Sequence, residues 1–194
     1  MNPRKGGTLS MADVLDEQKR QTKLDINCVK VGIIQSFNPS NQRAEIQIAY
    51  KQVKDIQDDG TKVYQEYPVL LDCPVITLFG GVDILSLPVQ SGDNCLVFFN
   101  DNEIDQWATN GTGNPQTFRM HDLSDAIAIV GIRPLSNVIT NYLANGIRLS
   151  HGVGNSQMDL KDDLIETIAE LFLHHGDMRI EGDLTVLGKI TAVS

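Results

Sequence analysis

Two short, wholly apolar runs lie near the middle of the chain, each bounded by residues that favour turns. Cys95 to Phe99 (CLVFF) follows Gly92-Asp93, and Ala126 to Val130 (AIAIV) is closed by Gly131. Runs of this length, with β-branched and aromatic residues, are typical of strands that are buried on both faces. The residues predicted from these runs to form a barrel core are Leu96, Val97, Phe98, Ile127 and Ile129.

A long polar connection joins the two runs and contains the only tryptophan, Trp107. Two buried strands with an excursion of this length between them favour a small closed barrel over a hairpin. Asp101, Glu103 and Asp105 alternate within it, but the Gly at the sixth position and the closing Glu of a calcium-binding loop are missing. We therefore expect these carboxylates to lie in a solvated loop.

The end of the connection holds His121, Asp122, Ser124 and Asp125, which are residue types found in hydrolases. They crowd into five positions, whereas the members of a catalytic triad usually come from distant segments. We predict that these side chains cap and hydrogen-bond the loop, and that the protein has no catalytic residues.

Residues 26–87 contain the patterns of further strands. Ala44 to Tyr50 alternates apolar and polar residues, which predicts a strand with one face in the core. The chain then has five or six strands before Val130, with long loops and few helical periods. An oligonucleotide/oligosaccharide-binding (OB)-like Greek-key barrel fits this count, and a β-sandwich fits it nearly as well. The other strand segments are Ile26–Ile34, Val63–Leu71 with an edge-strand signal at Pro68, and Val82–Leu87 after a loop at Phe79–Gly81.

The first 25 residues differ in character from this strand region. Ser10 can cap a short helix over Met11 to Lys23. The apolar stripe of that helix, at Met11, Val14 and Leu15, does not continue beyond its first turns. We expect a weak helix or an arm that docks on a neighbouring chain.

From Gly146 the sequence becomes repetitive, with short alternating segments separated by Gly, Asn or Asp. An isolated strand of this kind has nothing in its own chain against which to bury its apolar side. Three copies wound into a parallel or intertwined β-helix would bury the apolar positions on one axis and leave no free strand edge. The residues predicted to lie on this threefold axis are Met178, Ile180, Leu184, Val186 and Ile190.

Composition narrows the range of partners. The net charge of −9 argues against a nucleic-acid ligand, because phosphate binding needs clustered Lys and Arg. No run approaches the roughly 20 apolar residues that span a bilayer, and no signal-peptide core follows the N-terminus. Cys28, Cys73 and Cys95 lack Cys-x-x-Cys spacing, and we expect them to be small buried side chains in a reducing compartment.

The central stretch resembles a known family. Residues 87–107 read LPVQSGDNCLVFFNDNEIDQW, and residues 119–134 read RMHDLSDAIAIVGIRP. The Pro-x-x-x-Gly-Asp turn, the Asp-x-Trp and the His-Asp-Leu-Ser-Asp-Ala segment are similar to those of phage baseplate central spikes of the baseplate assembly protein V type. The resemblance extends more loosely from about Val31 to the C-terminus.

The resemblance implies an all-β protein with an N-terminal OB-like Greek-key barrel followed by a trimeric, intertwined β-helix needle. Its role would be structural and not enzymatic: a homotrimeric central spike that binds a baseplate hub protein and pierces the host outer membrane during sheath contraction. Such a protein is found in the virion and, during assembly, in the host cytoplasm. The domains predicted are an arm at 1–25, the barrel at 26–135, a linker at 136–145 and the spike at 146–194.

We expect no cofactor and no bound metal. Needles of the family often end in a His-x-His pair that holds an ion, but His174 and His175 are adjacent, so only one can face the axis of a strand-built needle. The last residues, Lys189 to Ser194, contain no histidine. The resemblance therefore implies a separate spike-tip protein as a further partner.

Asp162 to Gly176 conflicts with an all-β needle. Acidic residues at its start, histidines at its end and apolar residues at helical spacing favour a helix by local rules. The resemblance implies a strand, and packing in a trimer can override local propensity. We predict a strand here.

The alternative function is an OB-type module that binds carbohydrate or single-stranded nucleic acid on its barrel face. Such a module needs an exposed groove with aromatic and basic side chains. A single tryptophan and a net charge of −9 argue against the nucleic-acid version.

Overall fold

The computed structural model describes residues 10–152 and 155–190. The part of the predicted arm that precedes Ser10 lies outside this description. The chain divides into two units, Met1–Ser136 and Asn137–Ser194, and each is described by itself.

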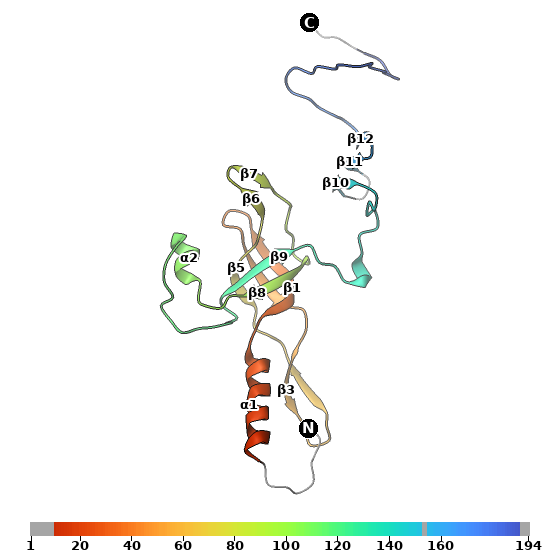
Figure 1. Ribbon diagram of the computed structural model, residues 1–194. Helices are drawn as coiled ribbons and strands as arrows, with labels where there is room; N and C mark the ends of the chain where they lie inside the picture. The colour runs from red at the N-terminus through yellow and green to blue at the C-terminus, as the bar shows by residue number, and fades with distance from the viewer. Residues whose placement is uncertain (1–9, 153–154, 191–194) are drawn as a thin grey trace. The chain divides into compact units, whose positions relative to one another are not determined.

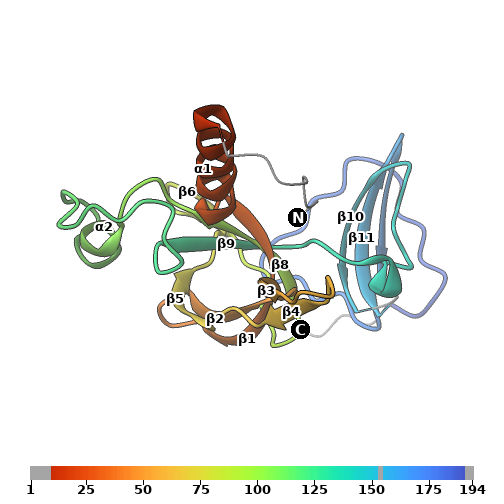
Figure 2. The same ribbon diagram turned by 90° about the horizontal axis from the view of Figure 1, so that it is seen from below.

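The first unit is built on one curled antiparallel sheet (Figure 1, Figure 2). Its strands lie in the order β5-β2-β1-β8-β9, so that β5 and β9 form the two edges. These edges meet at a parallel bridge between Val75 and Ala128, where the Ile76 amide donates to the Ala128 carbonyl at 2.8 Å. The prediction of a mostly β protein is confirmed, in the form of a half-barrel. The strands are β1 (Val29–Asn38), β2 (Arg43–Ile48), β5 (Leu70–Pro74), β8 (Asn94–Phe99) and β9 (Ala126–Val130).

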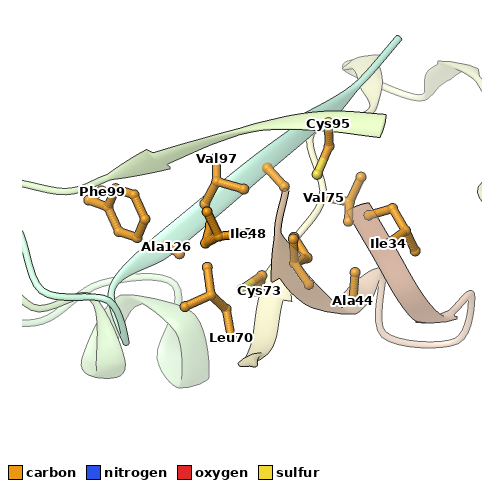
Figure 3. Packing of buried hydrophobic residues seen from close by; sticks show 12 residues of the cluster. Ile34, Ala44, Ile48, Leu70, Cys73, Val75, Cys95, Val97, Phe99 and Ala126 are labelled. Carbon is orange, nitrogen blue, oxygen red and sulfur yellow. The ribbon is translucent and has the colours of Figure 1, made fainter. Parts of the chain in front are cut away.

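The core lies on the concave side of this sheet (Figure 3). Buried and less buried positions alternate along β2, as its sequence pattern predicts. Gly32 of β1 leaves room for its neighbours, because a Cβ atom there would lie 2.5 Å from Cγ2 of Ile46. The buried apolar residues are Ile34, Ala44, Ile46, Ile48, Leu70, Cys73, Val75, Cys95, Val97, Phe99, Ala126 and Ala128.

Of the five residues predicted for the barrel core, Val97 alone belongs to it. Successive side chains of a strand point to opposite faces, and the core side of β8 and β9 is taken by the alternate positions. The other four point away from the core and are partly exposed in the single chain, so the expectation of strands buried on both faces is wrong for the single chain. They are Leu96, Phe98, Ile127 and Ile129.

The two apolar runs are direct neighbours in the sheet. β8 and β9 pair antiparallel from Cys95–Val130 to Phe99–Ala126, with residues 100–125 as their connection. The expectation that these two strands would not pair as a hairpin is therefore wrong. The connection is not wholly loop, because it contains a short helix, α2 (Asp105–Asn110).

Two hairpins extend from the sheet (Figure 1). The first, β3 (Gln52–Ile56) with β4 (Lys62–Gln65), turns at Asp58 to Gly60, and its first strand was not predicted. The second, β6 (Leu78–Gly80) with β7 (Asp83–Leu85), forms where a loop at Phe79–Gly81 was expected. Pro68 separates β4 from β5, and β5 is an edge strand as predicted.

The predicted N-terminal helix is α1 (Met11–Asp25). The Ser10 hydroxyl accepts a hydrogen bond from the Asp13 amide, and the Asp13 carboxylate accepts one from the Ser10 amide. This reciprocal capping box satisfies two backbone groups that the helix itself leaves unpaired. Among the described helices and strands, α1 packs against no other element.

The second unit begins at the last residue of a 3-10 turn, η1 (Leu135–Asn137), and contains a three-stranded antiparallel meander. Its strands are β10 (Ile147–His151), β11 (Ser156–Lys161) and β12 (Leu164–Ile168). The prediction of a strand over Asp162–Gly176 is confirmed for Leu164–Ile168 only, and the rest of this segment is neither strand nor helix.

Residues 169–190 contain no strand or helix in the described chain. The predicted axis residues Met178, Ile180, Leu184, Val186 and Ile190 are all exposed in the single chain. The intertwined needle remains a prediction about the assembled protein.

Candidate functional site

A buried ion pair organises the connection between β8 and β9. Asp125 has no exposed surface, and its carboxylate accepts hydrogen bonds from the Arg119 guanidinium at 3.1 and 3.2 Å. The same carboxylate accepts from the Ile104 amide at 3.1 Å. Arg119 also donates to Asp105, at the start of α2, at 2.8 Å. Hydrogen bonds to these carboxylates raise the pKa of Arg119, so its guanidinium is charged at neutral pH. Together these contacts hold Ile104 and Asp105, near the start of the connection, against Asp125 at its end.

Glu103 is the second buried carboxylate of the connection, with 7% of its surface exposed. It accepts hydrogen bonds from the Thr117 hydroxyl and from the Gln116 amide. These bonds lower the pKa of Glu103 below its usual value of 4.5, because they favour the charged form. The expectation of a solvated loop is therefore wrong for Glu103.

The residues of hydrolase type are used for local structure. The Asp122 carboxylate accepts from the amide and the hydroxyl of Ser124, and this lowers the pKa of Asp122. His121 lies next to Asp101, with Nε2 3.6 Å from the carboxylate. Asp125 faces Arg119 and not a histidine. These contacts are the capping and loop hydrogen bonds that the sequence predicts.

Arg43 ties helix α2 to the sheet. Its guanidinium donates to the Asp72 carbonyl at 3.0 Å and to the Ala108 carbonyl at 3.1 Å. Asn27, just before β1, also contacts the connection, because its side-chain amide donates to the His121 carbonyl at 3.0 Å. The connection is thus fixed to strands that are distant in the sequence.

Two of the three cysteines are core residues. Burial raises the pKa of Cys73 to about 12 and that of Cys95 to about 11, so both thiols are protonated at neutral pH. Cys28 is exposed, and the prediction of burial is wrong for it.

A second buried ion pair lies on one face of the meander in the second unit. Arg148 of β10 donates to both carboxylate oxygens of Asp159 on β11, at 2.7 and 2.6 Å. Lys161 lies 3.4 Å from Asp159 and 2.8 Å from Glu166 of β12. Asp159 has no exposed surface, and Arg148 also donates to the Asn141 carbonyl at 2.9 Å. On this face Asp159 is fully covered, whereas the Lys161 and Glu166 side chains are 27% and 42% exposed.

The opposite face of the meander is apolar and bare. The strand register aligns Ile147, Leu160 and Ile165 in one row across the three strands, and Leu149 with Met158 in the next. All five side chains are exposed, from 38% for Met158 to 70% for Ile165. The five apolar side chains of this face therefore meet solvent in the single chain, whereas Asp159 on the other face is fully covered and the Arg148 side chain is 19% exposed.

The two adjacent histidines, His174 and His175, lie on the surface of the described chain. His174 and His175 are both exposed, and His174 Nε2 lies 3.2 Å from the Asp177 carbonyl. Within residues 10–152 and 155–190, no three His, Cys, Asp or Glu side chains are placed to hold a metal ion. In the same residues, no helix has the length and apolar character that crossing a membrane requires.

A family model, described as the N-terminal domain of the phage protein Gp138, matches residues 31–131. The match covers more than half of the chain. The chain belongs to this Gp138 N-terminal domain family of phage proteins. A search of curated proteins found no match.

The residues that match the family model are those of the five-stranded sheet. The match begins within β1 and ends one residue after β9, so it covers the five-stranded sheet except the first two residues of β1, and it includes the Arg119–Asp125 ion pair. Helix α1 and the second unit lie outside the matched residues. The resemblance to a phage protein predicted from the sequence is thus supported over the sheet.

The lowered pKa of Glu103 predicts a pH-dependent contribution to stability. A carboxyl whose pKa is lowered by folding stabilises the folded state above its unfolded pKa, and that stabilisation disappears as the pH falls through the folded pKa. Glu103→Gln should therefore reduce the Tm at pH 7, and the difference from wild type should shrink below pH 4.5. Thermal melts from pH 3 to pH 7 measure this.

The matched control is Asp101→Asn, because the Asp101 side chain is 82% exposed in the same connection. It should leave the Tm unchanged across this range. A constant Tm difference for Glu103→Gln at every pH would contradict the ionised, hydrogen-bonded state of Glu103.

Proposed function

We propose that the protein is a structural virion protein, the homotrimeric central spike of a contractile-tail baseplate. Membership of a phage protein family supports the proposal that this is a protein of a phage particle. The observation that supports the trimer is the apolar face of the meander in the second unit, whose five side chains are exposed among the described residues. Burial of such a face in an assembly is favourable by roughly 25 cal/mol per Å² of apolar surface removed from water.

The first unit supports an OB-like barrel. Its order β5-β2-β1-β8-β9, with a parallel bridge between the outer strands, is that of five strands curled almost into closure. A partly open five-stranded Greek-key barrel is the OB architecture. We propose that this barrel attaches to the threefold baseplate hub.

The mechanism of the proposed spike is mechanical. Sheath contraction supplies the force, and the trimeric C-terminal part leads through the host outer membrane. Interlocked strands without free edges resist unfolding under load. A separate spike-tip protein would cover the apolar surface at the end of the needle.

The oligomeric state tests this proposal. Light scattering of the purified full chain at micromolar concentration should give three times the chain mass of 21.4 kDa. The physical reason is that contact with other copies would bury the apolar side chains that are exposed among the described residues of the second unit. A monomer at that concentration would contradict both the proposed spike and the predicted trimeric needle.

We propose that the protein is not an enzyme. His121→Ala with Asp125→Ala should alter stability only, because Asp125 serves Arg119 and the Ile104 amide. Assays with peptidoglycan and polysaccharide measure this. Reproducible hydrolysis by the wild-type protein that is lost in the double variant would restore the enzyme interpretation.

A further inference from the structure

The hairpin β6–β7 is apolar on both of its faces. Leu78 pairs with Leu85, and Phe79 pairs with Ile84, so each face carries one apolar pair. These four side chains are 45% to 68% exposed, and Val82 at the turn is 94% exposed. Among the described helices and strands, neither β6 nor β7 packs against any other element. A two-stranded hairpin of this size is not stable in water without a packing partner.

The convex side of the main sheet carries a second apolar surface, which is partly exposed among the described residues. Pairing in register places Val29, Phe98 and Ile127 in one row across β1, β8 and β9, and Val31, Leu96 and Ile129 in the next. Three of the six, Val29, Val31 and Phe98, are 37% to 47% exposed. We call these six residues the outer apolar face.

The β6–β7 hairpin and the outer apolar face carry little of the negative charge that makes copies of this chain repel one another. The chain has a net charge of −9, so contact between two copies is opposed wherever their acidic surfaces meet. The outer apolar face contains no charged residue, and the hairpin from Leu78 to Leu85 contains only Asp83. Two copies can therefore meet here without like-charge repulsion.

We propose that the β6–β7 hairpin of one copy packs on the outer apolar face of the next copy. This inference rests on the proposed homotrimer and adds a contact between the barrel units. Each chain carries one hairpin and one face, so a head-to-tail ring of three leaves neither surface bare. A face-to-face contact would join copies only in pairs and would leave the hairpins exposed. The hairpin lacks basic, Trp and Tyr residues, which disfavours a membrane surface as the occupant.

Crosslinking between introduced cysteines tests the contact in the full chain. Val82→Cys at the hairpin turn and Val31→Cys on the outer apolar face are combined with Cys28→Ser, which removes the exposed native thiol. Cys73 and Cys95 stay, because both are buried and protonated at neutral pH. A short bismaleimide should convert the protein into covalent trimer on a denaturing gel. Chains with only one of the two new cysteines should stay uncrosslinked, but a mixture of them should give covalent dimer.

A second set of variants tests the apolar contact itself. Phe79→Ser with Ile84→Ser, added to the two-cysteine chain, should abolish the covalent trimer. Asp83→Asn in the same hairpin is the matched control and should retain it. Loss in both variants, or in neither, would contradict an apolar contact through this hairpin.

The same samples are weighed by light scattering, which separates failure of this contact from failure of the trimer. A trimer that gives no crosslink overturns the hairpin contact and leaves the proposed spike standing. A covalent dimer from Val31→Cys alone shows face-to-face packing and overturns the ring. A crosslink confined to one chain overturns the contact between copies. A monomer overturns both proposals.

Discussion

Val186→Asp should abolish or strongly weaken the proposed trimer. If Val186 lies on the threefold axis, this change places three carboxylates close together in an environment without water. Burial of each charge is costly, and the three repel one another, so the cost is on the order of several kcal/mol per site and the aspartate pKa values rise. Thermal melts and light scattering of the full chain measure the effect.

Thr185→Asp is the matched control, because alternate residues of a strand point to opposite faces. It should leave the Tm and the mass of the trimer nearly unchanged in the same measurements. A slip of one residue in the predicted register would exchange the two results. Equal tolerance of both changes would show that no axial core exists at this part of the chain.

Ile46→Ala should be the most damaging single truncation in the first unit. Ile46 has no exposed surface and lies on β2, between β1 and β5 in the sheet. Its Cγ2 atom approaches Gly32 so closely that the neighbouring strand carries no side chain there. Truncation of a buried Ile to Ala costs about 2–5 kcal/mol, from lost burial plus the cavity that remains. Denaturant unfolding of the full chain, followed at the transition of the first unit, measures it.

Ile56→Ala removes the same atoms at an exposed site. Ile56 lies on β3 and is 51% exposed, so its truncation should change the free energy of unfolding by no more than about 0.5 kcal/mol. A similar loss for both variants would mean that the β2 position is not the centre of the core.

Several elements follow from local sequence alone. The helix α1 begins at Met11 because Ser10 and Asp13 cap each other's amides, a pattern that needs only four consecutive residues. The limits of β9 coincide with the apolar run from Ala126 to Val130, and the alternation in β2 matches its burial. Gly131 follows the last residue of β9 directly, and glycine favours a turn at such a position.

Tertiary structure decided which apolar face becomes the core. Val97 and Leu96 are neighbours of equal apolar character in the sequence, and no local rule distinguishes them. The curl of the sheet selects Val97, because its side points to the concave space that β2 and β5 also line. The other side carries the outer apolar face and suggests a contact between copies instead.

Tertiary structure also decided the role of the buried charges. The sequence predicts Glu103 to be a solvated loop residue. In the fold, Thr117 and Gln116, more than ten positions away, donate hydrogen bonds to its carboxylate. The spacing of apolar residues around Leu164 favours a helix, but pairing with β11 makes the segment a strand. The ladder satisfies its backbone groups and brings Glu166 to the Lys161 ammonium. The sequence by itself determined the capped helix and the limits of the strands, since these depend on neighbouring residues. Only the tertiary structure decided which side of each strand faces the core and which acids are paired, since these depend on contacts between distant ones.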